Sequence, residues 1–148
     1  MATQGSPEPG AGTETIVVGY TRGSGDHVVG IAVEEARRRG ARLVVIHSME
    51  SGPNNEREVQ EYQEHQKALE QVEQRLQEEG IPGETGLHIR GLNPADELAQ
   101  TVTERGASLL VIAYRRRSRT SKYLLGSDTQ EILIACPCPV LAVGRDVI

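Results

Sequence analysis

The chain has 148 residues, a formal net charge of -5, no Phe or Trp and only four Tyr. Its length suits one domain, because single-core domains most often have about 100–150 residues, and its core must be built from aliphatic side chains in layers of helices and strands. The acidic balance argues against a general nucleic-acid-binding protein, and no apolar run approaches the roughly 20 residues of a membrane-spanning helix. We therefore expect a cytoplasmic protein with no membrane contact, for which nucleic acid is a disfavoured partner.

Residues 1–14 are rich in Gly, Pro, Ser, Thr and Glu and show no apolar periodicity. Such a segment cannot bury enough apolar surface to offset the entropy lost on ordering. It also lacks the cationic start and apolar stretch of a signal peptide. We expect a disordered tail over residues 1–14 and a single domain over residues 15–148.

The first half of the domain alternates strands with helices. Residues 15–20 and 41–49 are nearly continuous apolar runs, as in strands of a parallel sheet that are buried on both faces. Between them, apolar residues recur at helical spacing until Gly40 supplies a stop signal. A long amphipathic helix is predicted over residues 55–79, and we expect it to lie on the sheet. Its apolar stripe consists of Val59, Tyr62, Leu69, Val72 and Leu76.

The second half continues the alternation. The predicted elements are a polar, edge-like strand at 84–90, a helix from the N-cap Asn93 to Gly106, an apolar strand at 107–114, a helix at 127–135 and a last strand at 138–144. With right-handed crossovers, this pattern predicts a single-domain, three-layer α/β fold around a five-stranded parallel sheet. Ligands of such folds collect beyond the carboxyl ends of strands, where neighbouring connections diverge. The loops at 21–25 and 114–126 are therefore the candidate ligand loops.

Cys136 and Cys138 are one residue apart, too close for an ordinary intrachain disulfide and without the C-x-x-C spacing of redox or zinc motifs. We interpret them as packing residues, and a redox role has only the presence of the pair in its favour. The four histidines lack metal-ligand spacing such as H-x-x-x-H, so we expect them to be structural. No nucleophile beside a base is legible, so we expect no enzyme activity.

Four stretches, "IVVGY", "VVIHSME", "NPADELAQTVTERGASLLVIA" and "YLLGSDTQEILIACPCPVLAV", resemble the universal stress protein family, and the resemblance covers about residues 15–145. It implies the adenine nucleotide alpha hydrolase-like sheet order 3-2-1-4-5 and a homodimer through the last strand. It also implies other, unidentified protein partners. Some members of the family bind ATP.

The nucleotide motif of those members runs Gly, two residues, Gly, nine residues, then Gly with Ser or Thr. Here Gly126 and Ser127 match the closing pair, and with Thr129 they would meet phosphates through amides and hydroxyls at a helix N-terminus. The alternative is that Gly126 is only a turn glycine and Ser127 an ordinary N-cap. Ala113 and Arg116 stand where the two earlier glycines would be. The Arg116 side chain would narrow the pocket, and its backbone would be strained in any left-handed conformation.

Two further positions follow from the same resemblance. Thr21 stands where ATP-binding members carry an Asp, and Ser48 aligns with a position that would meet the adenine edge through its backbone. The loop that follows the fourth strand is cationic, with Arg115, Arg116, Arg117, Arg119 and Lys122. Its side chains either are simply solvated or hold an anion in place of glycine-lined amides. Binding of nucleic acid is a third interpretation, which the lack of aromatic stacking residues disfavours.

These observations support three hypotheses. The first is a non-enzymatic stress-response homodimer with a degenerate nucleotide motif and no cofactor. The second is a module that binds ATP or another adenine nucleotide with Mg²⁺, using Gly126, Ser127, Thr129 and the basic loop. The third is a weak ATPase.

Overall fold

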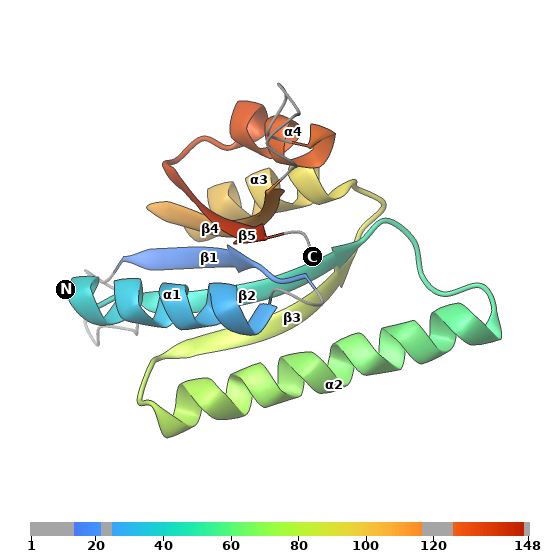
Figure 1. Cartoon of the computed structure of the whole chain (residues 1–148), viewed down its shortest axis with the longest axis horizontal. Coiled ribbons are helices and arrows are strands. Elements are labelled where there is room, and N and C mark those ends of the chain that lie inside the picture. The colour runs from blue at the N-terminus through green and yellow to red at the C-terminus, as the bar shows by residue number, and fades with distance from the viewer. Residues whose placement is uncertain (1–13, 22–24, 117–125, 147–148) are drawn as a thin grey trace.

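The computed structural model describes residues 14–21, 25–116 and 126–146, which form one sheet and four helices (Figure 1). The strands are β1 (Thr15–Gly19), β2 (Arg42–Met49), β3 (Gly83–Ile89), β4 (Leu109–Arg116) and β5 (Val140–Asp146). The helices are α1 (Gly25–Arg39), α2 (Glu56–Glu78), α3 (Pro94–Arg105) and α4 (Ser127–Ala135). All strand pairs are parallel, in the order β3-β2-β1-β4-β5, which confirms the predicted fold. Of the predicted tail, residues 1–13 lie outside the described residues.

The core has two halves because successive residues of a strand face opposite sides of the sheet. In β1, Ile16 and Val18 pack with side chains of α1 and α2, whereas Val17 packs with side chains of α3 and α4. All three β1 residues have no exposed surface. Burial on both faces explains why these strands read as continuous apolar runs rather than as an alternation of apolar and polar residues.

Helix α2 covers the sheet only along its C-terminal half. Leu69, Val72 and Leu76 are buried, but the Val59 side chain is 40% exposed. Figure 1 shows the N-terminal end of α2 extending past the carboxyl ends of the strands, where no sheet lies beneath it. The prediction that the whole apolar stripe covers the sheet was therefore wrong for its first turns.

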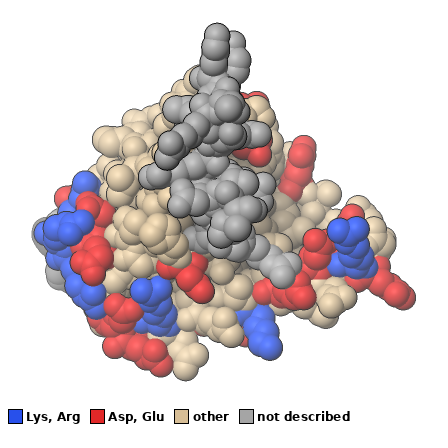
Figure 2. Space-filling model, in the orientation of Figure 1, with Lys and Arg blue, Asp and Glu red and all other residues tan. Residues whose placement is uncertain are grey.

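Ion pairs gather at the end of the sheet where α1 and α2 finish, and Figure 2 shows cations and carboxylates interspersed there. Glu79 accepts from Arg37 at 2.9 Å and from Arg75 at 2.8 Å. Glu14 accepts from the Ser108 hydroxyl at 2.7 Å. Each exposed pair contributes little to stability because solvent screens it, but on the face that Figure 2 shows the two signs of charge alternate at this end.

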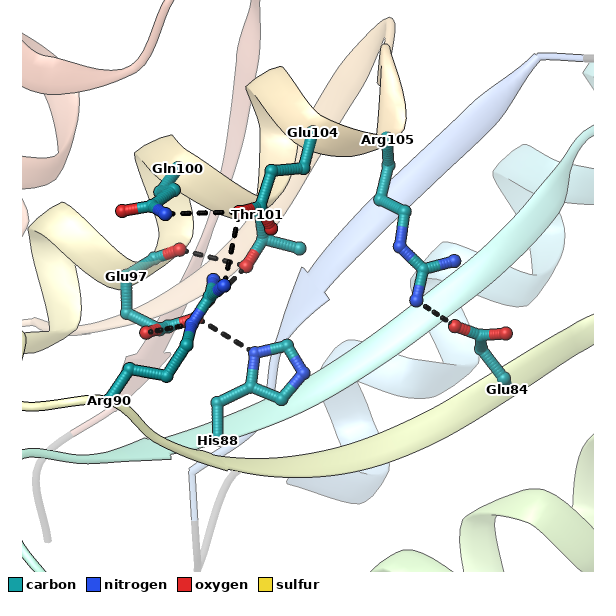
Figure 3. Close-up of polar contacts among 8 residues, drawn as sticks. All are labelled: Glu84, His88, Arg90, Glu97, Gln100, Thr101, Glu104 and Arg105. Carbon is teal, nitrogen blue, oxygen red and sulfur yellow. Dashed lines mark hydrogen bonds and ion pairs between the residues drawn. The ribbon is translucent and has the colours of Figure 1, made fainter.

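A buried carboxylate joins β3 to α3 (Figure 3). The Glu97 side chain is 1% exposed and accepts from Arg90 Nη2 at 2.5 Å and from His88 Nδ1 at 2.8 Å. The Thr101 hydroxyl adds a bond at 3.2 Å, and Arg90 also contacts Glu104 at 3.1 Å. Burial raises the pKa of Glu97, but the bonds from Arg90 and His88 outweigh it, and the pKa lies below its ordinary value of 4.5. Such bonds offset the cost of burying a charge.

Replacing Glu97 by Gln should destabilise the fold in a pH-dependent way. Because the folded pKa of Glu97 lies below 4.5, its ionised form contributes fully above that pH, and the contribution is lost as the pH falls further. We expect Glu97→Gln to lower the free energy of unfolding by about 2 kcal/mol near neutral pH, as for hydrogen bonds to charged groups. In urea titrations the difference from wild type should shrink below about pH 4. A difference that is the same at both pH values, or equal to that of the exposed control Glu73→Gln, would contradict this account.

Candidate functional site

The carboxyl ends of β1, β2 and β4 open into a cavity of about 480 Å³. The walls come from residues 19–21, 46–48 and 112–114, from Pro94 and Leu98 at the start of α3, and from residues 126–129 and Ile132 of α4. The sheet order creates this hollow, because after β1 the chain turns to β2 on one side while β4 lies on the other. We call this cavity the crevice.

Six of the residues singled out in the sequence line the crevice. They come from four separate segments and are Thr21, Ser48, Ala113, Gly126, Ser127 and Thr129. The crevice therefore lies beyond the first and fourth strands, as predicted. Residues 117–125 lie outside the described residues, as do the side chains of Arg115 and Arg116, so the predicted cationic loop is not described.

Arg115 and Arg116 form the last two positions of β4, where their register partners are Arg145 and Asp146 of β5. The Arg116 backbone is therefore extended, and the strain expected for a left-handed arginine does not arise there. Ala113 lies three residues earlier, paired with Val143, and lines the crevice.

Helix α4 begins at the crevice without a side-chain cap. Its N-cap is Gly126, with φ -71° and ψ 167°, and Ser127 is the first helical residue. The interpretation of Ser127 as an ordinary N-cap was therefore wrong, and Gly126 does not use the left-handed freedom of glycine. The first amides of a helix lack intrahelical acceptors and carry a partial positive charge. With the Ser127 and Thr129 hydroxyls nearby they suit an anion, although the carboxylate of Asp128 in the same turn repels one.

His47, which lines the crevice, is stacked on a second histidine. The Nδ1 of His47 donates to the Tyr20 carbonyl at 3.0 Å, and its ring stacks on His65 of α2 with centroids 3.8 Å apart and planes 10° apart. His65 Nδ1 in turn donates to the Glu61 carbonyl at 2.8 Å. Burial and His65 lower the pKa of His47, against the Tyr20 carbonyl, which raises it. His47 is thus neutral at neutral pH, and the stack ties α2 to the crevice.

From the sequence we expected His47 and His65 to be structural, and their hydrogen bonds to backbone carbonyls agree with that expectation. The contact between the two rings was not predicted. The two rings come from a strand and a helix that meet only in the fold. The available signal was the alternation along β2, which places His47 on the same face as Leu43 and Val45, the face that α2 covers.

The crevice combines an apolar wall with polar groups at its rim. Ile46, Leu98, Ile112 and Ile132 supply the wall. Ligand sites of this kind hold a flat apolar group and fix its polar end with a few hydrogen bonds.

Among the described residues, no group of three or more His, Cys, Asp or Glu side chains is placed to hold a metal ion. No helix in the same part of the chain is long and apolar enough to cross a bilayer.

Comparison with known proteins gives one consistent result. The sequence profile of the universal stress protein family matches residues 12–144. A universal stress protein of Mycolicibacterium smegmatis is 36% identical, over 86% of this chain and 95% of that one. The solved structure of a universal stress protein from Archaeoglobus fulgidus is 28% identical with a TM-score of 0.71, over 88% of this chain and 93% of that one. A structure of the universal stress protein from the same organism in complex with dAMP is 26% identical with a TM-score of 0.66, over 88% and 97%.

Adding a methyl group at Gly25 should disturb the crevice. A Cβ there would lie 2.0 Å from the buried ring of Tyr20. The backbone carbonyl of the same residue accepts the hydrogen bond from His47. Although alanine normally favours a helix over glycine, we expect Gly25→Ala to lower the free energy of unfolding by about 1–3 kcal/mol through overpacking. The matched control is Gly52→Ala, where a Cβ would meet nothing within 4 Å, and its effect should stay within about 0.5 kcal/mol. Equal thermal melting curves for the two variants would show that the Tyr20 ring moves freely.

Proposed function

The chain belongs to the universal stress protein family, and from this we propose that it is a stress-response module that binds an adenine nucleotide in the crevice. The observation that carries the proposal is the uncapped start of α4, which faces an apolar wall across the crevice at the switch point of the sheet. The relative whose complex contains dAMP shares this fold over 88% of the chain.

In the proposed complex, the base lies against the apolar wall near Ile112 and Leu98. The phosphate accepts hydrogen bonds from the first amides of α4 and from the hydroxyls of Ser127 and Thr129. The negative charge of Asp128 in the same turn favours a single phosphate over the longer anionic chain of ATP. The alternative ligand is ATP with Mg²⁺, which would need Arg115 and Arg116 to balance its charge.

We propose that the module acts by binding rather than by catalysis. His47 is the histidine that the described part of the chain brings to the crevice, and its Nδ1 already donates to the Tyr20 carbonyl. Its ring is also held by the stack with His65, so it is not free to turn toward a hydroxyl of α4. In the proposed role, nucleotide binding changes how the module contacts its protein partners. We also propose that the protein is cytoplasmic.

Calorimetric titration with AMP tests the ligand. We expect wild type to bind, and Ser127→Ala to bind several-fold to about tenfold more weakly, because one hydrogen bond contributes about 0.5–1.5 kcal/mol. The control is Thr103→Ala, a hydroxyl that donates to the Ala99 carbonyl on the exposed side of α3 and should leave binding unchanged. Absence of heat with both AMP and Mg²⁺-ATP would contradict the proposal.

The same titration with Arg116→Gly separates the remaining hypotheses. If wild type were silent and Arg116→Gly bound nucleotide, the arginine would have closed the crevice, and the degenerate-motif hypothesis would replace ours. If Arg116→Gly bound Mg²⁺-ATP more weakly than wild type, the arginine would hold phosphate.

We further propose that two copies pair through β5. Among the described strands it lies at an edge of the sheet, and an edge strand presents a row of backbone groups that can pair with another chain. The helix that leads into it, α4, carries two exposed apolar side chains, Ile134 at 85% and Leu133 at 42%. A two-fold interface in which each copy presents the same strand and helix would shelter both features.

A charge at Ile134 tests the homodimer. In sedimentation velocity at micromolar concentration we expect wild type to be dimeric and Ile134→Glu to be shifted toward monomer by at least about tenfold in dissociation constant, because burying an unpaired charge is costly. Val59→Glu, on the exposed start of α2, is the matched control and should remain dimeric. A monomeric wild type would refute the pairing.

A further inference from the structure

The two cysteines of the chain lie in contact between α4 and β5. The Sγ atoms of Cys136 and Cys138 are 3.6 Å apart, both residues are half-buried, and neither is in a disulfide. The spacing in sequence argued against a bridge, because cysteines one residue apart are too close for an ordinary intrachain disulfide. The connection is not a regular strand. Cys136 leaves the helix with φ -75° and ψ 127°, and the chain bends at Pro137 and Cys138.

Neither a zinc site nor simple packing accounts for the contact between the two sulfurs. A structural zinc ion takes four ligands, but no third His, Cys, Asp or Glu of the described residues joins the two sulfurs. Packing alone explains why both thiols border the apolar cluster of α3 and α4. It does not explain why the two sulfurs face each other at a part of the surface that small oxidants can reach.

We propose that Cys136 and Cys138 are a redox-responsive thiol pair, which a peroxide or a small disulfide oxidises to an intramolecular disulfide and a thiol reduces again. With hydrogen peroxide, one cysteine releases its thiol proton and the thiolate attacks an oxygen. The O–O bond breaks, a sulfenic acid forms, and the departing hydroxide takes up the released proton as water. The second sulfur then attacks the sulfenic sulfur, the S–S bond forms, and the hydroxyl leaves as water with the proton of the second thiol. The two sulfurs lose two electrons, and the peroxide oxygens gain them.

The surroundings assign the order of attack. Burial and the hydrogen bond with Cys136 raise the pKa of the Cys138 thiol to about 12. The Cys138 thiol also lies 3.4 Å from the Pro139 carbonyl, to which it donates. Because the thiolate is the nucleophile, Cys136 attacks the oxidant and Cys138 resolves the intermediate.

The bridge would act locally. Pro139, next to Cys138, accepts a hydrogen bond from the Leu110 amide at 3.0 Å at the start of the β4 and β5 pairing. At its other end, α4 lines the crevice. A disulfide that closes so short a loop removes little entropy from the unfolded chain. Oxidation should therefore leave the fold intact and alter the segment between the crevice and the edge strand.

Intact mass spectrometry of the reduced full-length chain tests the proposal after treatment with hydrogen peroxide or glutathione disulfide and alkylation in denaturant. We expect both thiols to disappear together, the mass to fall by two hydrogens, the product to stay a single chain on a non-reducing gel, and dithiothreitol to restore both thiols. Chains linked only to each other, stable sulfinic acids without a bridge, or thiols that survive an excess of oxidant would each overturn it.

Single variants check the order of attack. Cys138→Ser should accumulate a sulfenic acid at Cys136 that a 1,3-diketone traps, because the resolving sulfur is gone. Cys136→Ser should react with peroxide at least about tenfold more slowly than Cys138→Ser, since burial and the hydrogen bond to the Pro139 carbonyl still disfavour the thiolate of Cys138. Equal rates for the two variants would contradict the assigned roles. The mass of oxidised wild type tests separately whether the disulfide forms.

Discussion

Burial of the central strands on both faces is the constraint from which the rest of this structure follows. Residues 16–18 of β1 have no exposed surface, and their neighbours in β2 and β4 are buried to nearly the same degree. Such strands require helices on both sides, and right-handed crossovers then send the chain in opposite directions from β1. The carboxyl ends of β1, β2 and β4 are left without a covering element among the described residues, and the crevice forms there.

Helix α4 links the features that we connect with function. Its first turn lies at the crevice without a side-chain cap, its last turns expose Ile134, and the cysteine pair follows it at the start of β5. A helix of nine residues cannot be rigid by itself, because isolated helices shorter than about 12 residues are marginal. Its position depends on Ile132 in the core and on the segments at its two ends. Ligand, partner and oxidant would thus act on the same short element.

The sequence was sufficient to predict every strand and helix of the described residues, because both apolar runs and capping residues such as Asn93 are local signals. Topology also predicted that the ends of the first and fourth strands meet at the crevice, and the family resemblance added Ser48 and residues 126–129. The contribution of Pro94 and Leu98 of α3 was not predicted. The errors concern contacts that depend on the fold. The exposed start of α2 depends on where the sheet ends, and the stack of His47 on His65 depends on how α2 crosses β2. The cysteine contact was missed because spacing alone does not show the bend at Pro137 and Cys138, where the two sulfurs come into contact.

Amide chemical shifts would show whether an adenine nucleotide lies between the apolar wall and the start of α4. Isotope-labelled protein would be titrated with AMP and followed by two-dimensional NMR. We expect shifts at residues 126–129, with the Ser127 amide among the largest, and smaller shifts at residues 46–48 and 112–114. Shifts that leave residues 126–129 unchanged and cluster elsewhere, for example along α2, would contradict it.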